Sequence, residues 1–222
     1  MMFYVFAALG VAALAGVALW IYVMSNVEQQ RYRVVIADGP IELRDYPASI
    51  VAEVTRQGSR QAAVNAGFGP LASYIFAKER AGDKIAMTAP VTQQRETIAM
   101  TAPVTQSAGA NGDWTVRFIM PAKYTLETLP KPANADVRIA TAPATRRAAI
   151  RFSGYATDAA IAEQEAALMA WMRSRKLTAT GAATYAYYND PFTPGPLRRN
   201  EVMFDVVEDE PRPASVTQPI AG

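Results

Sequence analysis

The chain has 222 residues, half of them hydrophobic, and its 22 basic and 20 acidic residues leave a net charge of +2. It contains no cysteine and no histidine, which excludes disulfides, cysteine-based zinc or iron–sulfur sites and any catalytic arrangement that needs a histidine base. The balanced charge, without a basic stripe interleaved with aromatic residues, argues against a nucleic-acid partner. We find no motif that predicts a catalytic residue, so the expectation is a binding protein, not an enzyme.

The chain begins with an apolar segment. Residues 2–24 carry no charge and are numerous enough to cross the roughly 30 Å hydrocarbon layer as one helix. A cleaved signal peptide is the alternative, with a small-residue site at residues 13–15, but no basic residue precedes the run and it continues to Val23 with aromatic residues typical of the interface. We therefore expect an uncleaved transmembrane anchor over residues 1–24 and a linker over residues 25–30. Arg31 and Arg33 only weakly favour a cytoplasmic domain, so the side of the membrane stays open.

The first half of the globular part reads as strands followed by one helix. Ser59 is a suitable N-cap for a helix that runs to about Lys78, and Pro70 predicts a kink within it. The apolar stripe of this helix is Val64, Phe68, Leu71 and Ile75, with helical spacing. The predicted strands before it, separated by turn residues, cover residues 32–37, 41–46 and 49–56.

A nine-residue sequence, Ile-Ala-Met-Thr-Ala-Pro-Val-Thr-Gln, occurs twice, at residues 85–93 and 98–106. Each copy alternates apolar and polar positions, which is typical of a half-buried strand. A loop at residues 94–97 would pair the copies as an antiparallel hairpin with Val91 opposite Met100. The proline of each copy cannot donate to a ladder, which indicates a sheet edge or a bulge.

The second half repeats the order of strands, one helix and strands. Thr157 is a suitable N-cap for a helix to about Lys176, whose inner face carries Ile161, Leu168, Trp171 and Met172. Residues 191–196 read as a rigid, proline-rich excursion, and residues 208–222 as a disordered tail. The predicted strands of this half cover residues 113–120, 137–141, 146–152, 184–188 and 200–207.

These elements predict one α+β domain over residues 31–207, with two similar halves and a curved, mainly antiparallel sheet. A groove between helix and sheet would suit a small apolar ligand, and the side chains expected to line it are Phe68, Leu71, Ile75, Met87 and Met100. The alternative is that these side chains fill the core, which is the usual role of an apolar stripe.

Several stretches, taken in order, make the sequence resemble the SOUL haem-binding protein family. They include Ile41-Glu-Leu-Arg-Asp-Tyr-Pro47, both copies of Ile-Ala-Met-Thr-Ala-Pro-Val, residues 116–121, 124–130 and 197–202. The resemblance covers nearly all of residues 31–207. It implies a pseudo-two-fold curved sheet or distorted barrel with two long helices, similar to the small-molecule-binding domains of GyrI-like regulators. It also implies that haem or another tetrapyrrole is the ligand.

A histidine-ligated haem cannot form in a chain without histidine. Iron could be held by a residue of another type, for which Met87, Met100, Tyr74 and Tyr187 are available, so the metal ligand is unknown. We favour a ring that lies on apolar surface with its propionates near Arg198 or Lys84. Arg198 and Arg199 could equally form a structural ion-pair network with Glu201.

The expected function is therefore that of a membrane-tethered carrier or buffer of haem or another tetrapyrrole. Two alternatives stay open from the sequence. One is a generic sensor of amphipathic small molecules of the GyrI-like type, and the other is a protein-interaction module without a small ligand.

Overall fold

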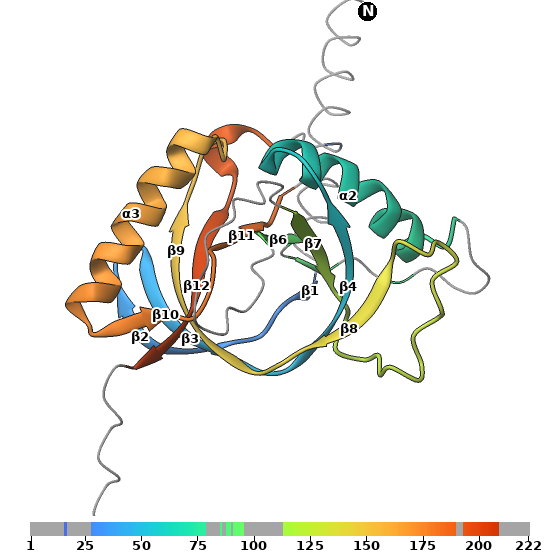
Figure 1. Cartoon of the computed structure of the whole chain (residues 1–222), viewed down its shortest axis with the longest axis horizontal. Coiled ribbons are helices and arrows are strands. Elements are labelled where there is room, and N and C mark those ends of the chain that lie inside the picture. The colour runs from blue at the N-terminus through green and yellow to red at the C-terminus, as the bar shows by residue number, and fades with distance from the viewer. Residues whose placement is uncertain are drawn as a thin grey trace, which may run out of the picture.

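The computed structural model describes residue 16 and residues 28–78, 85, 88–89, 91–95, 113–189 and 193–208. The strands form a strongly curved, ten-stranded antiparallel sheet, and the two helices lie on the outside of the curve (Figure 1). This confirms the predicted α+β class with two long helices. In chain order the elements are β1 (Glu28–Gln29), β2 (Arg33–Asp38), β3 (Ile41–Tyr46), β4 (Ser49–Arg56), α2 (Arg60–Ile75), β5 (Thr88–Ala89), β6 (Val91–Arg95), β7 (Trp114–Ile119), β8 (Arg138–Ala142), β9 (Thr145–Phe152), α3 (Asp158–Ser174), β10 (Leu177–Ala179), β11 (Thr184–Tyr187), the 3-10 helix η1 (Gly195–Leu197) and β12 (Asn200–Glu208).

The order of strands across the sheet shows the two similar halves. It runs β2-β3-β9-β12-β11-β6-β7-β4-β8, with β10 paired to β12 outside this path, and it extends in both directions from the central β11–β6 pair. In the first half β4, α2, β5, β6 and β7 follow one another along the chain, and in the second half β9, α3, β10, β11 and β12 do so. In each half, the helix thus comes after an outer strand of the sheet and before two paired inner strands in the order of the chain.

Both helices begin at the predicted caps. The hydroxyls of Ser59 and Thr157 accept hydrogen bonds from the backbone N–H of Ala62 and Ala160, which satisfies one free donor in each first turn. The two helices also pack on the same face of the sheet. Residues that are paired across neighbouring strands point to the same face, and one such row runs from Val202 on β12 across β11 and β6 to Val116 on β7. Val202 lies in the core beneath α3 and Val116 in the core beneath α2.

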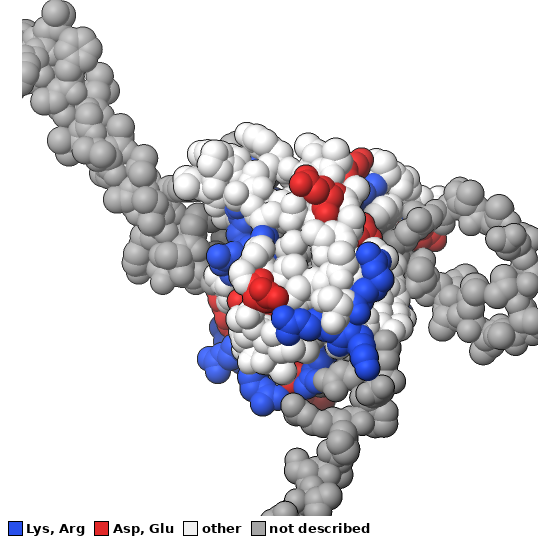
Figure 2. Space-filling model, turned by 90° about the vertical axis from the view of Figure 1, so that its left-hand side faces the viewer, with Lys and Arg blue, Asp and Glu red and all other residues white. Residues whose placement is uncertain are grey.

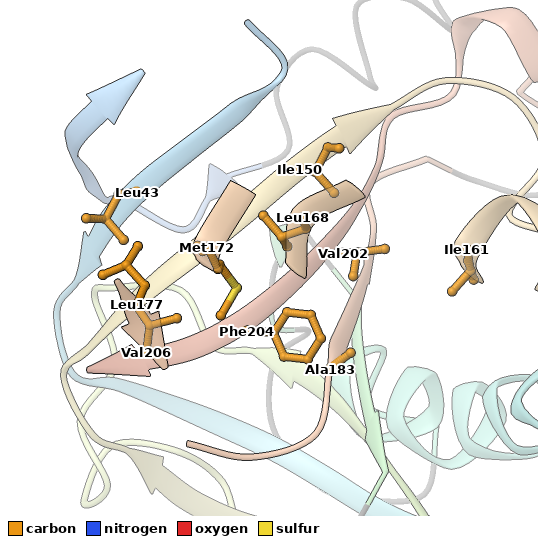
Figure 3. Packing of buried hydrophobic residues seen from close by; sticks show 11 residues of the cluster. Leu43, Ile150, Ile161, Leu168, Met172, Leu177, Ala183, Val202, Phe204 and Val206 are labelled. Carbon is orange, nitrogen blue, oxygen red and sulfur yellow. The ribbon is translucent and has the colours of Figure 1, made fainter. Parts of the chain in front are cut away.

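The helix α3 covers its half as the sequence predicts. Ile161, Leu168 and Met172 are buried, and Trp171 packs against the same cluster. Figure 3 shows Ile161, Leu168 and Met172 among buried residues of β3, β9 and β12. Figure 2, which views the molecule from this side, shows acidic side chains among basic ones, and the basic ones gather towards the lower end of the picture.

The helix α2 buries only part of the predicted stripe. Leu71 and Ile75 are buried, together with Ala63, Gly67 and Tyr74, while the Phe68 side chain is 38% exposed and Val64 only packs at the margin. The reason is Gly67, which has no side chain and lets the helix approach the valines of β4 and β7 closely. An apolar stripe counted from large residues alone cannot detect a face built on glycine and alanine.

The guanidinium of Arg60 joins the two helix N-termini. It donates to Asp158 Oδ1 at 2.8 and 3.0 Å, to Tyr187 Oη at 2.6 Å and to the carbonyl oxygen of Ala156 at 2.7 Å. A positive charge in a first helical turn is unfavourable by itself, and the carboxylate of Asp158 at the start of α3 offsets it. This contact fixes the two halves of the fold relative to each other.

The predicted hairpin between the two copies of the repeat is wrong for residues 91–93, the part of the first copy that lies in β6. This strand pairs with β7 along one edge and with β11 along the other, so Val91 lies opposite Phe118 and Tyr187 instead of Met100. Gln94 and Arg95, which were predicted to turn, continue the strand. Local sequence favoured a short-range pairing, but neighbours distant in sequence occupy both edges. The second copy lies outside the described residues.

The ends of the chain differ in how far the structure tests them. No helix among the described residues is long and apolar enough to cross a membrane. The predicted anchor lies outside the described residues except for Gly16, as does the predicted tail beyond Glu208. Within the predicted linker, Glu28 and Gln29 form β1, which pairs in parallel with β5. A polar dipeptide carries no alternation, so only the tertiary neighbour explains this strand.

Candidate ligand-binding groove

A half-open groove of about 330 Å³ lies at one end of the sheet. Four separate parts of the chain form it: the segment that begins with β1, the turn between β3 and β4, the end of β7 with the residues after it, and β8. The lining residues are 28–31, 47–50, 119–122, Tyr124 and Thr141. Because these parts are far apart in sequence, no local pattern predicts the groove.

Hydrogen bonds hold the N-terminal segment in place as one wall. The backbone N–H of Ala122 donates to Glu28 Oε1 at 3.1 Å, and the Gln30 side chain donates to Ser49 Oγ at 3.3 Å. The parallel pairing of β1 with β5 fixes the same segment from its other side. The groove therefore exists only where residues 28–31 cross the ends of β4 and β7.

The lining combines an apolar wall with polar residues of the N-terminal segment, one acidic and one basic. Ile50, Ile119, Met120 and the ring of Tyr124 supply the apolar wall, and Met120 is almost fully buried. Arg31 is exposed at the rim. The only lining carboxylate, Glu28, already accepts the Ala122 hydrogen bond. This arrangement suits an amphiphile with an apolar body and an anionic end.

Of the six residues predicted as the binding site the structure describes four, Phe68, Leu71 and Ile75 on α2 and Arg198 directly after η1. Leu71 and Ile75 are fully buried in one core cluster with Phe118. The ring of Phe68 is partly exposed on α2 and packs edge-on against Phe118 with centroids 5.3 Å apart. Met87 and Met100 lie outside the described residues. Leu71 and Ile75 thus fill the core, which is the alternative to lining a groove that the sequence left open.

Arg198 lies elsewhere, in the second half of the chain. Its Nε donates to the carbonyl oxygen of Thr193 at 2.8 Å, and its guanidinium stacks 4.7 Å from the ring centroid of Tyr155. Lys84, the other predicted propionate partner, lies outside the described residues.

Two tyrosines considered as iron ligands have other partners. The hydroxyl of Tyr74 donates to the carbonyl oxygen of Pro130 at 2.7 Å, and that of Tyr187 accepts from Arg60 at 2.6 Å. Burial raises the pKa of Tyr187, although the nearby Arg60 opposes the shift. A phenolate at Tyr74 could no longer donate to Pro130, and burial disfavours a phenolate at Tyr187, whose oxygen already accepts from Arg60, so neither is a suitable ligand.

A buried ionic network lies on the face of the sheet opposite the helices. The two terminal nitrogens of Arg44 donate to the carboxylate of Glu201 at 2.8 and 3.1 Å, and Arg199 donates to it at 2.8 Å. The hydroxyl of Tyr188 donates to the same carboxylate at 2.7 Å. Glu201 is 1% exposed. The structural ion pair expected at this position is therefore present, but Arg44 takes the role that the sequence assigned to Arg198.

The charges in this network stabilise one another. Burial alone would raise the pKa of Glu201, but the hydrogen bonds and charges of Arg44 and Arg199 outweigh it and hold the pKa below its ordinary value. Burial, and then the charge of Glu201, raises the pKa of Tyr188, so its hydroxyl stays protonated as a donor. Both oxygens of Glu201 accept hydrogen bonds from these donors. Glu201 therefore has a structural role and is not a binding group for a cationic ligand.

The network also shows what sequence reasoning missed. Alternation along β3 places Glu42, Arg44 and Tyr46 on one face, and a charged residue within such a strand signals a buried partner. Arg44 does bond Glu42 and Tyr46, at 2.7 and 3.0 Å. Its main partner is 157 positions away, however, and only the pairing of β9 with both β3 and β12 brings it close.

Asp45, on the other face of β3, gives the fold a measurable pH dependence. Hydrogen bonds from Arg146 at 2.7 Å and then Arg33 at 2.7 Å lower the pKa of Asp45 to about 2. The unfolded chain therefore binds more protons than the folded one between pH about 4 and about 2, and stability falls as pH drops through this window. We expect acid titration of the unfolding free energy to show this loss, and Asp45→Asn to flatten it. An unchanged slope in the variant would contradict the assignment.

The fold and the groove together define an α+β domain with a cavity of ligand size, in which two symmetrically placed helices back one curved sheet. The family described as SOUL heme-binding protein matches residues 27–205. The chain belongs to this family, as its sequence motifs indicate. A search of curated protein sequences gives no match.

Solved structures of other proteins share the fold at low sequence identity. The C-terminal domain of EcmrR has a TM-score of 0.57 at 13% identity, and the match covers 80% of this chain and 98% of that domain. A protein described as a hydrolase from Listeria innocua has a TM-score of 0.52 at 14% identity, with 78% and 94% of the two chains covered. EcmrR in a DNA complex gives 0.55 at 10% identity, covering 76% of this chain and 57% of that one. These similarities concern the fold alone.

Proposed function

We propose that this protein binds haem or another tetrapyrrole in the groove at the end of the sheet, as a membrane-tethered carrier or buffer. The observation that carries the proposal is the groove itself, an apolar wall with an exposed arginine beside it in a member of a haem-binding family. The tether is the apolar segment of residues 2–24, which precedes the groove wall by only a few residues. A tetrapyrrole partitions into bilayers, so a site beside the membrane would suit its transfer.

The donor set of the groove supports recognition of the ring more than of the iron. With no histidine in the chain, Met120 and Tyr124 are the only lining residues of a type that ligates haem iron. The apolar wall would contact the ring, and Arg31 at the rim would bind a propionate. A volume of about 330 Å³ is near the lower end for ligand pockets, so part of a tetrapyrrole would stay in solvent. Affinity is then expected to depend little on the metal.

The direct test is to titrate haemin, and iron-free protoporphyrin beside it, into the full chain in lipid nanodiscs, with empty nanodiscs as the blank. Saturable binding of both, near one ring per chain, supports a site that recognises the ring. A strong preference for haemin would instead indicate ligation by Met120 or Tyr124. Absence of saturable binding would remove the proposal.

A bulky side chain in the groove should separate it from the site predicted on α2. Ala122 is an exposed lining residue whose contact with Glu28 uses only its backbone N–H, so Ala122→Trp should fill the groove without disturbing the core. We expect at least tenfold weaker binding of protoporphyrin, measured by fluorescence. Ala167→Trp, at an exposed position of α3, is the matched control and should bind like wild type.

The rival location has its own variant. Phe68→Asp changes the most exposed residue of the predicted α2 stripe and should leave affinity unchanged if the ligand lies in the groove. The reverse pattern, with binding lost in Phe68→Asp and kept in Ala122→Trp, would transfer the site to α2. Loss in neither variant would exclude both locations.

The charges in the groove separate this function from a sensor of amphipathic cations. Glu28 and Arg31 both line the groove and both are exposed. Glu28 accepts a hydrogen bond from the backbone N–H of Ala122, and Arg31 is the lining residue that would bind an anionic ligand.

A further inference from the structure

The first three residues of the internal strand β6, Val91 to Gln93, are the end of the first copy of the repeated nonapeptide. Both edges of β6 are hydrogen-bonded, to β7 and to β11, and Thr92 within it is buried. Ile85, the first residue of this copy, is also buried, in the core beneath α2, and its N–H donates to the carbonyl oxygen of Ile75 at 2.7 Å. The first copy thus fills a position at the centre of the fold.

The second copy has the same side chain at every position of the first. Ile98 is equivalent to Ile85, Val104 to Val91, and Thr105 to Thr92. The identity ends only after Gln93, where Gln94 and Arg95 correspond to Ser107 and Ala108 at the last two positions of β6. If the chain shifted by thirteen positions, the core and the first three residue pairs on each edge of β6 would therefore meet identical residues.

The connections on either side of β6 allow the shift. With the first copy in place, residues 76–84 precede it and residues 96–113 link β6 to β7. With the second copy in place, the preceding connection would extend to residue 97 and the following one would shrink to residues 109–113. One loop lengthens as the other shortens, and closure entropy depends only on the logarithm of loop length, so the two costs nearly cancel. The shorter connection contains Asn111-Gly112, a favoured hairpin turn.

We propose that the folded protein exists in two registers, in which either copy of Ile-Ala-Met-Thr-Ala-Pro-Val-Thr-Gln supplies β6. In one register the spare copy leaves the sheet after β6, and in the other it leaves before β6. The wall of the groove is the same in both, because Thr88-Ala89, which pairs with β1, is repeated as Thr101-Ala102. The inference is therefore independent of the proposed ligand.

The repeat can be tested by disabling each copy in turn. Ile85→Asp places a charge in the core and should exclude the first register, and Ile98→Asp should exclude the second. With two nearly equal registers, each single variant loses about a factor of two in the ratio of folded to unfolded protein, and the double variant unfolds. If Ile85→Asp alone unfolds the chain and Ile98→Asp has no effect, only one register exists and the proposal is wrong.

Trypsin gives a second measurement on the same variants. Arg95 is the only basic residue between Lys84 and Arg117, so cleavage in this stretch reports on one position. In the first register Arg95 ends β6 opposite Trp114, and in the second it belongs to a connection. Cleavage after Arg95 in the native protein should be at least tenfold faster in Ile85→Asp than in Ile98→Asp, with wild type between them. Equal rates in the two variants would overturn the proposal.

Discussion

Glu201→Gln is expected to lower the free energy of unfolding by about 3 kcal/mol, because it leaves a buried arginine without its main counter-charge. Arg44 is 2% exposed and directs two nitrogens at the Glu201 carboxylate, while Arg199 and Tyr188 donate to the same group. Glu42 still pairs with Arg44 at 2.7 Å and keeps the loss at the lower end of the range for a broken buried pair. Urea unfolding followed by circular dichroism measures the change.

The matched control is an ion pair at the surface. Asp136→Asn removes the carboxylate that bonds Arg56 at 2.9 Å, but the Asp136 side chain is 60% exposed, so the loss should be under about 1 kcal/mol. Equal losses in the two variants would show that burial of the network contributes nothing. A Glu201→Gln variant as stable as wild type would mean that Arg44 finds sufficient compensation elsewhere.

Gly67→Ala is expected to destabilise the protein by about 1–3 kcal/mol, although alanine is the better helix former. A β-carbon at this position would lie 2.8 and 2.9 Å from the side chain of Val116 and 3.1 Å from that of Val54. The backbone of α2 would have to move away from β4 and β7, and with it the core around Leu71. Thermal or urea unfolding shows the effect directly.

Gly69, in the same helix, provides the comparison. Apart from its chain neighbours and the backbone of its own helix, no atom lies within 4 Å of a β-carbon at this position, so Gly69→Ala introduces no clash with the sheet. The gain in helix propensity is opposed by the steric restriction on the residue before Pro70, and the net change should stay within about 1 kcal/mol. Equal losses of stability in Gly67→Ala and Gly69→Ala would contradict the close-packing explanation for Gly67. They would mean that helix propensity or the neighbouring proline determines the effect.

The sequence identified most elements because their signals are local. The strands over residues 41–46 and 49–56 follow from alternation, and the two helices from Ser59 and Thr157 with the spacing behind them. Where the signal was not local, prediction failed. Glycine and alanine turned the buried face of α2 away from Phe68, and β1 formed from two polar residues because β5 lies beside it.

The candidate site shows the same division. The sequence indicated an apolar ligand and a haem-binding family, since composition and motifs can be read without coordinates. It could not place the groove, because residues 28–31, 47–50, 119–122 and Thr141 meet only when β4 pairs with both β7 and β8.

The sequence by itself thus determined the fold class, the family and the absence of histidine and cysteine chemistry. All three depend on residue types and on contacts between near neighbours. The tertiary structure alone decided which strands flank β6, which carboxylate neutralises Arg44 and where a ligand-sized cavity opens. These features join residues that are up to 157 positions apart, and their energies arise from desolvation and packing that exist only after the sheet has formed.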